Sequence, residues 1–187
     1  MKIKQRPVVK EGALEKAKRI TYVVIDIHGV LTDGTLYYTA DGTKSERFSL
    51  HDKLGFILLK QGGLKYAFLT SKISRADQAM AKVYGVPEEL LWGSSAKMSL
   101  TDEKQKELGF VDEEMAYIGD EMIDLGMMKR AGLAVAPADS AREAMEIADY
   151  VTQAGGGRGV LREVAEFILK AQGKWDEVVK VITGEEG

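Results

Sequence analysis

The chain has 187 residues, enough for one domain with a sizeable core. With 45% hydrophobic residues, 29% charged residues and a net charge of -3, it gives no reason to expect nucleic acid or an anionic membrane as a partner. The absence of cysteine excludes disulfides, thiolate catalysis and Cys-ligated metals. No apolar run approaches the ~18 residues of a membrane span, so we expect a cytoplasmic protein.

Strand and helix patterns alternate along the chain. Residues 1–20 are basic, and Leu14 and Ala17 give a weak helical face, which predicts a short first helix. Two strand-like runs around Asp41 and Gly42 predict a β-hairpin over 34–50. Apolar runs predict further strands at 22–25, 64–69, 90–92, 115–118, 133–136 and 150–151. Helices are predicted over about ten residues before Gly62, at 74–84, at 97–108 and at 140–147. Two more are predicted, one that follows the segment 119–124 and ends at 129, and one that follows the glycine cluster at 155–159 and ends at about 172.

This alternation predicts an α/β fold, a doubly wound parallel sheet with helices on both faces. No internal repeat, low-complexity block or long linker divides the sequence, so residues 1–187 are predicted to form a single domain. Within it we expect 34–50 to be a hairpin insertion and 153–187 to be a C-terminal tail and helix.

The first predicted strand ends on a carboxylate, Asp26, which is costly to bury unless it serves a metal, a partner or a reaction. Ligands of open parallel sheets bind beyond the carboxyl ends of the strands. Later strand ends carry Thr70, Lys97, and Asp120 with Asp124, so these groups can converge. Each also has an ordinary interpretation, as a turn residue or helix cap, a surface lysine, or acids at a helix N-terminus. Their joint appearance favours a functional site.

Together these positions make sense as a phosphoryl-transfer site. A carboxylate such as Asp26 can attack phosphorus and form an acyl phosphate. Two or three carboxylates can hold Mg²⁺, a cation that prefers oxygen ligands. The hydroxyl of Thr70 and the ammonium of Lys97 can neutralise phosphate oxygens as charge develops.

The order of the four strand-end positions resembles the haloacid-dehalogenase superfamily of aspartyl-phosphate phosphatases. A short hairpin in place of a large cap domain, the run Gly29-Val-Leu-Thr-Asp-Gly34 and the tail Gly156-Gly-Arg158-Gly-Val-Leu-Arg162-Glu163 narrow the resemblance. They are similar to the 3-deoxy-D-manno-octulosonate (KDO) 8-phosphate phosphatases and to the related domain of some CMP-sialate synthetases. The similarity covers about residues 12–175.

The resemblance implies a role for each residue of the site. Asp26 would be the nucleophile, and the backbone carbonyl of His28 would complete a Mg²⁺ site with Asp26 and Asp120. Asp124 would orient Lys97 or a metal-bound water.

The resemblance also implies a homotetramer assembled through the hairpins. In it, Arg158 or Arg162 of one subunit would reach toward a neighbour's site. With His51, Asp52 and Lys72, these arginines are the predicted substrate-binding residues.

This chain departs from the family's pattern at the acid/base position. The family's phosphatases carry Asp two residues after the nucleophile, where this chain has His28. An acid/base group contributes about 10²–10⁴-fold. Histidine, with an ordinary pKa of ~6.5, can do this work, and the alternative is a loss of function. The family also tends to place arginines at four positions where bidentate donors recognise a carboxylated sugar phosphate. This chain has His51, Ile57, Lys72 and Met80 there.

Two functions follow from the sequence. The first is a Mg²⁺-dependent phosphatase acting through an aspartyl phosphate on a small phosphorylated metabolite, a sugar-acid phosphate such as KDO 8-phosphate or a related nonulosonate phosphate. The alternative is a catalytically impaired phosphatase-like domain that serves as an oligomerisation or interaction module. Turnover of phosphoesters with Mg²⁺ separates the two.

Overall fold

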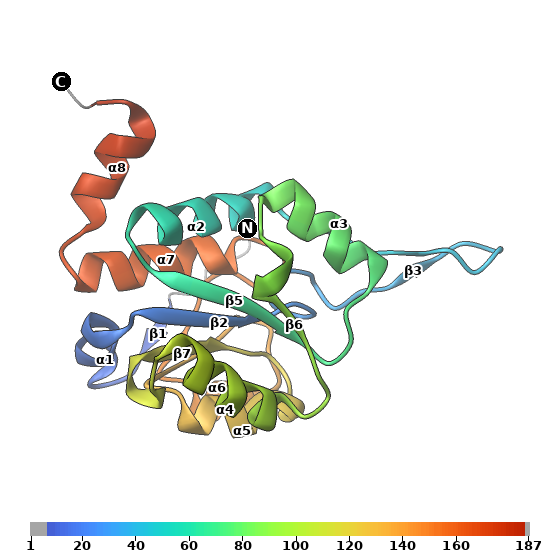
Figure 1. Ribbon diagram of the computed structural model, residues 1–187, viewed down its shortest axis with the longest axis horizontal. Coiled ribbons are helices and arrows are strands. Elements are labelled where there is room, and N and C mark those ends of the chain that lie inside the picture. The colour runs from blue at the N-terminus through green and yellow to red at the C-terminus, as the bar shows by residue number, and fades with distance from the viewer. Residues whose placement is uncertain (1–6, 186–187) are drawn as a thin grey trace, which may run out of the picture.

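The computed structural model describes residues 7–185, so the predicted chain ends at 1–6 and 186–187 lie outside the described residues. Its main feature is a seven-stranded sheet with the order β1-β9-β8-β7-β2-β5-β6, which crosses the middle of the molecule (Figure 1). The parallel strands are β2 (Tyr22–Asp26), β5 (Lys65–Thr70), β6 (Leu91–Gly93), β7 (Met115–Ile118), β8 (Leu133–Ala136) and β9 (Tyr150–Val151). The predicted doubly wound parallel sheet is confirmed.

The sheet has one antiparallel edge that the sequence did not predict. β1 (Val8–Val9) pairs antiparallel with β9. Its two residues are exposed and too few to show an alternating pattern, so the basic segment before the first helix gave no strand signal.

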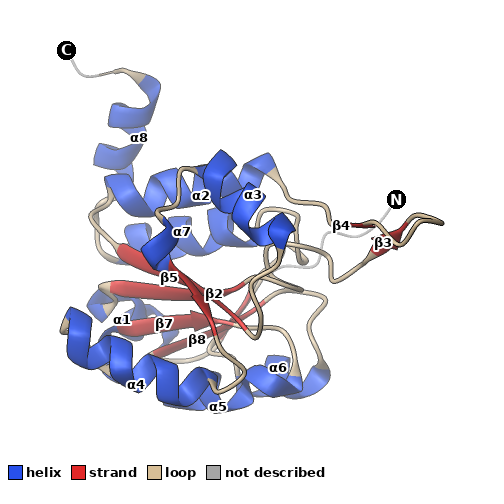
Figure 2. Ribbon diagram, turned by 45° about the vertical axis from the view of Figure 1, so that its right-hand side comes forward, coloured by secondary structure: helices blue, strands red, loops and turns tan. Residues whose placement is uncertain are grey.

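Helices cover both faces of the sheet (Figure 2). One layer contains α1 (Ala13–Arg19), α2 (Leu50–Gln61), α3 (Arg75–Tyr84) and α7 (Val160–Ala171). The other contains α4 (Lys97–Leu108), α5 (Leu125–Arg130) and α6 (Arg142–Ile147). The last helix, α8 (Trp175–Thr183), extends away from both layers (Figure 1). Among residues 7–185, no helix combines the length and the hydrophobicity that crossing a bilayer requires.

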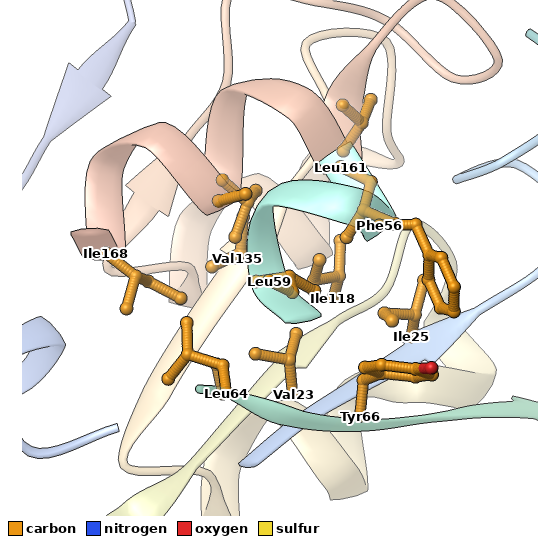
Figure 3. Packing of buried hydrophobic residues seen from close by; sticks show 14 of the residues in the cluster. Val23, Ile25, Phe56, Leu59, Leu64, Tyr66, Ile118, Val135, Leu161 and Ile168 are labelled. Atoms are coloured by element: carbon orange, nitrogen blue, oxygen red, sulfur yellow. The ribbon is translucent and has the colours of Figure 1, made fainter. Parts of the chain in front are cut away.

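The central strand β2 organises the core on both sides. All five of its residues are buried, and successive side chains point to opposite faces, as the pleat requires. Val23 and Ile25 join the cluster under α2 and α7, where Phe56 packs near them (Figure 3). Tyr22 and Val24 join the cluster under α4, α5 and α6. Because β2 is buried on both faces, the charged residue at its end is held firmly in place.

The predicted hairpin is present but shorter than expected. β3 (Tyr37–Tyr38) pairs antiparallel with β4 (Lys44–Ser45), and the pair projects from the molecule beside α3 (Figure 1). The prediction of a strand up to Leu50 is wrong, because Ser49 caps α2. Its hydroxyl accepts a hydrogen bond from the backbone N–H of His51, and the helix begins at Leu50.

Candidate active site

The parallel register brings the predicted strand ends together. Asp26 is the last residue of β2 and lies opposite Leu69, so Thr70 follows directly beside it. On the other side β2 pairs with β7, and Asp120 comes two residues after that strand ends. The pocket at this edge has a volume of about 510 Å³. Its lining includes Asp26, His28, Thr70, Lys72, Asp120 and Glu121.

Lys97 joins two buried carboxylates. Its Nζ lies 2.7 Å from Asp26 Oδ1 and 2.8 Å from Asp124 Oδ1. Lys97 is the first residue of α4, and only 6% of it is exposed, which excludes the interpretation as a surface lysine. A lysine buried this deeply is stable as a cation only when it is paired. The pairing fixes the carboxylate of Asp26 at the floor of the pocket.

Asp124 is occupied by protein donors on both of its oxygens. Besides the Lys97 ammonium, its Oδ1 accepts a hydrogen bond of 2.7 Å from the hydroxyl of Tyr117. Its Oδ2 accepts from the backbone N–H groups of Asp120 and Glu121, at 3.2 and 3.3 Å. Of the two roles that the resemblance implied, these contacts favour the orientation of Lys97. Tyr117 was missed because a buried aromatic in a strand has the pattern of an ordinary core residue.

Burial and mutual repulsion raise the pKa values of Asp26 and Asp120. Burial, followed by the charge of Asp124, raises the pKa of Asp26 to about 6, although Lys97 opposes the shift. Burial, followed by the charges of Asp26 and Asp124, raises the pKa of Asp120 to about 7. Burial acts to lower the pKa of Lys97, but Asp26 and Asp124 outweigh it and raise that pKa. The site therefore holds more negative charge than its lysine neutralises.

We call Asp26, Asp120, Asp124 and Lys97 the carboxylate cluster. One oxygen of each of its three carboxylates lies within 4.8 Å of the others. A divalent cation fits beside Asp26 and Asp120, because both oxygens of Asp124 already accept hydrogen bonds. Asp120 has room only because Gly29 lacks a side chain, since a Cβ there would lie 1.9 Å from Asp120 Oδ2. Gly29 also has a φ of 84°, which favours glycine. Carboxylate oxygens are the ligands that Mg²⁺ prefers.

The glycine-rich tail supports the loop that carries Gly29. A Cβ on Gly156 would lie 2.2 Å from the carbonyl oxygen of Gly29. The N–H of Gly157 donates to the carbonyl of Val30 at 2.9 Å. The tail motif thus acts on the site by packing backbone against backbone beneath it.

His28 joins the pocket to a second group of polar residues. Its Nδ1 lies 3.3 Å from Thr70 Oγ1. Its Nε2 lies 3.3 Å from Glu46 Oε1 and 3.5 Å from Asp77 Oδ1. We call His28, Glu46 and Asp77 the hairpin cluster, since Glu46 directly follows β4. The hairpin cluster could not be predicted from the sequence, because Glu46 lies in irregular backbone and Asp77 in the first turn of α3 has the pattern of a helix cap.

The structure divides the predicted substrate-binding residues. Lys72 lines the pocket with Asp26. His51, Arg158 and Arg162 line a separate pocket of about 570 Å³ beside α7. A single chain therefore does not bring the two arginines to the nucleophile.

Asp52 is a structural residue, and its prediction as a substrate contact is wrong. It is fully buried, and its two oxygens accept hydrogen bonds from the N–H groups of Gly159 and Leu161, at 3.1 and 2.9 Å. These donors belong to the start of α7, so Asp52 anchors that helix to α2. Burial raises the pKa of Asp52 to about 6, although the two N–H groups oppose the shift.

Comparisons with known proteins agree with this geometry. Residues 80–164 match the family of haloacid dehalogenase-like hydrolases. The 3-deoxy-D-manno-octulosonate 8-phosphate phosphatase of Escherichia coli (strain K12) is 33% identical over 169 residues, which cover 90% of this chain and 89% of that protein. The Moraxella catarrhalis phosphatase of the same name was crystallised with magnesium, phosphate and KDO. It has a TM-score of 0.84 and 33% identity, over 91% of this chain and 97% of that one. The Yersinia pestis phosphatase has a TM-score of 0.83 and 32% identity over 89% of each chain.

The fold and the site define a haloacid-dehalogenase-like hydrolase that cleaves phosphoric monoesters. Within this superfamily, the chain belongs to the family of 3-deoxy-D-manno-octulosonate 8-phosphate phosphatases. The described residues contain no large cap domain. The resemblance seen in the sequence is confirmed, and the homology supports a phosphatase of the sugar-phosphate type.

Proposed function

We propose that the chain is a Mg²⁺-dependent phosphatase that hydrolyses a sugar-acid phosphate through an aspartyl phosphate on Asp26. The observation that carries this proposal is the buried carboxylate of Asp26, which faces a pocket and is held by a lysine 2.7 Å away. Asp26, Asp120 and the backbone carbonyl of His28 would hold Mg²⁺, and the ion would neutralise phosphate oxygens during transfer.

Three residues of the chain have separate roles in the transfer of the phosphoryl group. A carboxylate oxygen of Asp26 attacks phosphorus, and the bond from phosphorus to the sugar oxygen breaks. Lys97 holds the nucleophile in place, while Thr70 donates its hydroxyl hydrogen to a phosphoryl oxygen. Water then attacks the aspartyl phosphate, which releases phosphate and restores Asp26.

His28 is the candidate acid and base. Its Nδ1 lies on the pocket side, within 3.3 Å of Thr70 Oγ1. From there it would give a proton to the departing sugar oxygen and later take one from the attacking water. The proton taken from water replaces the one that left on the sugar oxygen, so His28 ends in its starting state.

The relatives and the second pocket support the proposed substrate class. The Moraxella catarrhalis relative was crystallised with KDO, a sugar acid. Lys72 lines the nucleophile's pocket in this chain, whereas Arg158 and Arg162 lie elsewhere. We include in the proposal a cytoplasmic homotetramer in which Arg158 or Arg162 of one subunit completes a neighbour's site and binds the substrate carboxylate.

The test is the variant Asp26→Asn, assayed on p-nitrophenyl phosphate and on KDO 8-phosphate with Mg²⁺ or EDTA. We expect turnover by the wild type only with Mg²⁺, and no turnover by the variant. Asp176→Asn, a change of the same kind at an exposed position in α8, is the control and should keep full activity. Unchanged turnover in Asp26→Asn would contradict the mechanism. A folded wild type without any turnover would favour the interaction module.

A second variant tests His28. We expect His28→Ala to lower kcat/KM for KDO 8-phosphate by about 10²–10⁴-fold, because an alkoxide leaving group needs a proton. The loss on p-nitrophenyl phosphate should be much smaller, since that leaving group departs without one. Equal losses on both substrates would contradict the acid/base role. Higher turnover in His28→Asp would show that histidine is the weaker group at this position.

A further inference from the structure

The hairpin cluster consists of buried atoms whose bonding capacity is not used. The side chains of Glu46 and Asp77 are 0% exposed, although each carries a carboxylate. Within the described residues, both carboxylate oxygens of Glu46, Asp77 Oδ1 and His28 Nε2 have no hydrogen-bond partner. Glu46 Oε1 has only an ion pair, with Lys44 Nζ at 2.7 Å, whereas Asp77 Oδ2 accepts a hydrogen bond from the N–H of Ser74. Leaving such groups unpaired is costly, which points to a missing ligand.

The spacing of these atoms does not suit direct hydrogen bonds. A charge-assisted N–H···O bond is about 2.7–2.9 Å long. The distances from His28 Nε2 to the two carboxylates are 3.3 and 3.5 Å. Ligand atoms held about 2.1 Å from a tetrahedral ion lie about 3.4 Å from one another. Both distances from His28 therefore match the spacing of ligand atoms around a small ion, and the ligand atoms of Glu46 and Asp77 lie within 4.8 Å of each other.

We propose that His28, Glu46 and Asp77 bind a divalent transition-metal ion of the Zn²⁺ class. One imidazole nitrogen and two carboxylates are ligands that favour such an ion over Mg²⁺. Three protein ligands leave a fourth position for water. Lys44 neutralises one carboxylate when no ion is bound, and its side chain is 35% exposed, so it can turn into solvent when an ion arrives.

This site is separate from the carboxylate cluster, although it shares His28 with the proposed mechanism. An imidazole that binds an ion through Nε2 does not cycle between its neutral and charged forms near neutral pH, so acid/base work by His28 belongs to the ion-free state. The proposed Mg²⁺ site uses the backbone carbonyl of His28, whereas the second ion uses Nε2 of its ring. The bound ion ties together three segments: the loop after β2, the end of the β3–β4 hairpin and the first turn of α3. It also leaves Nδ1 as the only ring nitrogen free to face Thr70, which fixes the orientation of the imidazole.

The experiment is a titration of the full chain with Co²⁺, a spectroscopic substitute for Zn²⁺. Saturating Mg²⁺ is present throughout, and binding is monitored by the visible absorption of the Co²⁺ complex. Co²⁺ can also bind carboxylates of the first site, so Asp120→Asn is titrated in parallel to disable that site. We expect one tetrahedral Co²⁺ per chain in both proteins, displaced by Zn²⁺.

Variants of the hairpin cluster give the discriminating results. Glu46→Gln and Asp77→Asn should each weaken Co²⁺ binding at least tenfold. Glu46→Gln leaves the cap of α3 untouched, so it keeps the test valid if Asp77→Asn disturbs that helix. Lys44→Gln should tighten binding several-fold, because it removes the competing cation. Glu143→Gln, at an exposed position in α6, is the control and should change nothing.

Two results would overturn the proposal. One is the absence of a tetrahedral Co²⁺ spectrum in the wild type. The other is binding that disappears in Asp120→Asn and persists in Glu46→Gln, which would place the ion among the carboxylates of the first site. Because the readout is ion binding, a failure here is distinct from a failure of the phosphatase assays.

Discussion

The carboxylate cluster and the hairpin cluster are joined by the segment from Asp26 to His28, which contributes one residue to each, and they differ in how buried charge is paired. In the first, Lys97 bridges two carboxylates at 2.7 and 2.8 Å, and Asp124 accepts hydrogen bonds on both oxygens. In the second, Nε2 and three carboxylate oxygens have no hydrogen-bond partner within the described residues. The first is arranged in advance by the protein, whereas the second is complete only with a ligand.

The backbone explains this difference. The residues of the carboxylate cluster lie at or just beyond the ends of strands, or on the first turn of a helix, in parts of the chain packed on both sides of the sheet. The hairpin cluster depends on Glu46, which lies in irregular backbone after the two-residue strand β4. Rigid elements hold hydrogen-bond geometry to a few tenths of an ångström, and a projecting hairpin does not.

The largest effect is expected from removing the cation of the first cluster. Lys97→Met keeps the shape of the side chain but leaves Asp26 and Asp124 buried without their partner. Breaking one side of a buried ion pair costs about 3–5 kcal/mol, so urea unfolding in EDTA should show a loss of that order. Mg²⁺ should reduce the loss, because it supplies positive charge to the same carboxylates. Turnover should be lost as well, since the nucleophile is no longer held.

Lys16→Met is the matched control for this variant. Lys16 also pairs with a carboxylate, Asp149, at 2.7 Å, but its side chain is 37% exposed. Exposed pairs contribute less than about 1 kcal/mol, because water screens them. Similar losses in Lys97→Met and Lys16→Met would mean that burial does not distinguish the first cluster.

Much of the fold and of the first cluster could be predicted from the sequence, for one physical reason. An apolar strand that ends on Asp26 places that residue at a sheet edge, and parallel register then aligns Thr70 and Asp120 with it. The periodicity of apolar residues and the order of the strands, both of which can be identified in the sequence, are enough to predict that these residues lie at one edge. Glu46 and Asp77 could not be predicted, because their meeting depends on how a hairpin folds over α3. Asp52 was misassigned because a buried cap and a substrate contact have the same sequence pattern.

Asp52 shows a third way of holding buried charge, since it is a buried carboxylate that has only backbone donors. Its pKa is raised from 3.8 to about 6 in the folded protein. The folded state therefore holds the proton more tightly than the unfolded state. The stability due to this group is full below pH 3.8 and is lost as the pH rises through about 6. At 1.36 kcal/mol per unit, the loss is about 3 kcal/mol.

The variant Asp52→Asn isolates that titration. It should be less stable than the wild type at low pH, because its amide group cannot accept from both N–H donors. Between about pH 4 and 7 the wild type should then lose about 3 kcal/mol more than the variant, as the linkage predicts. Urea unfolding at several pH values in EDTA measures this difference, and Asp26 and Asp120 cancel from it. Parallel stability curves for the two proteins would show that Asp52 does not titrate in this range.

The smallest effect is expected at Tyr117, whose hydroxyl is one of several donors to Asp124. Tyr117→Phe removes the 2.7 Å bond but leaves Lys97 between its two carboxylates. A hydrogen bond to a charged group contributes about 1.5–3 kcal/mol, against about 1 kcal/mol for a neutral acceptor. Tyr84→Phe, which removes a hydroxyl donating to the neutral carbonyl of Ser49, is the matched control and should lower Tm less.

We expect kcat of Tyr117→Phe to stay within a few-fold of the wild type, because Lys97 alone fixes Asp26. A tenfold loss of kcat in Tyr117→Phe but not in Tyr84→Phe would mean that the geometry of the carboxylate cluster depends on Tyr117. The rigidity of the cluster would then be shared among several donors rather than set by Lys97.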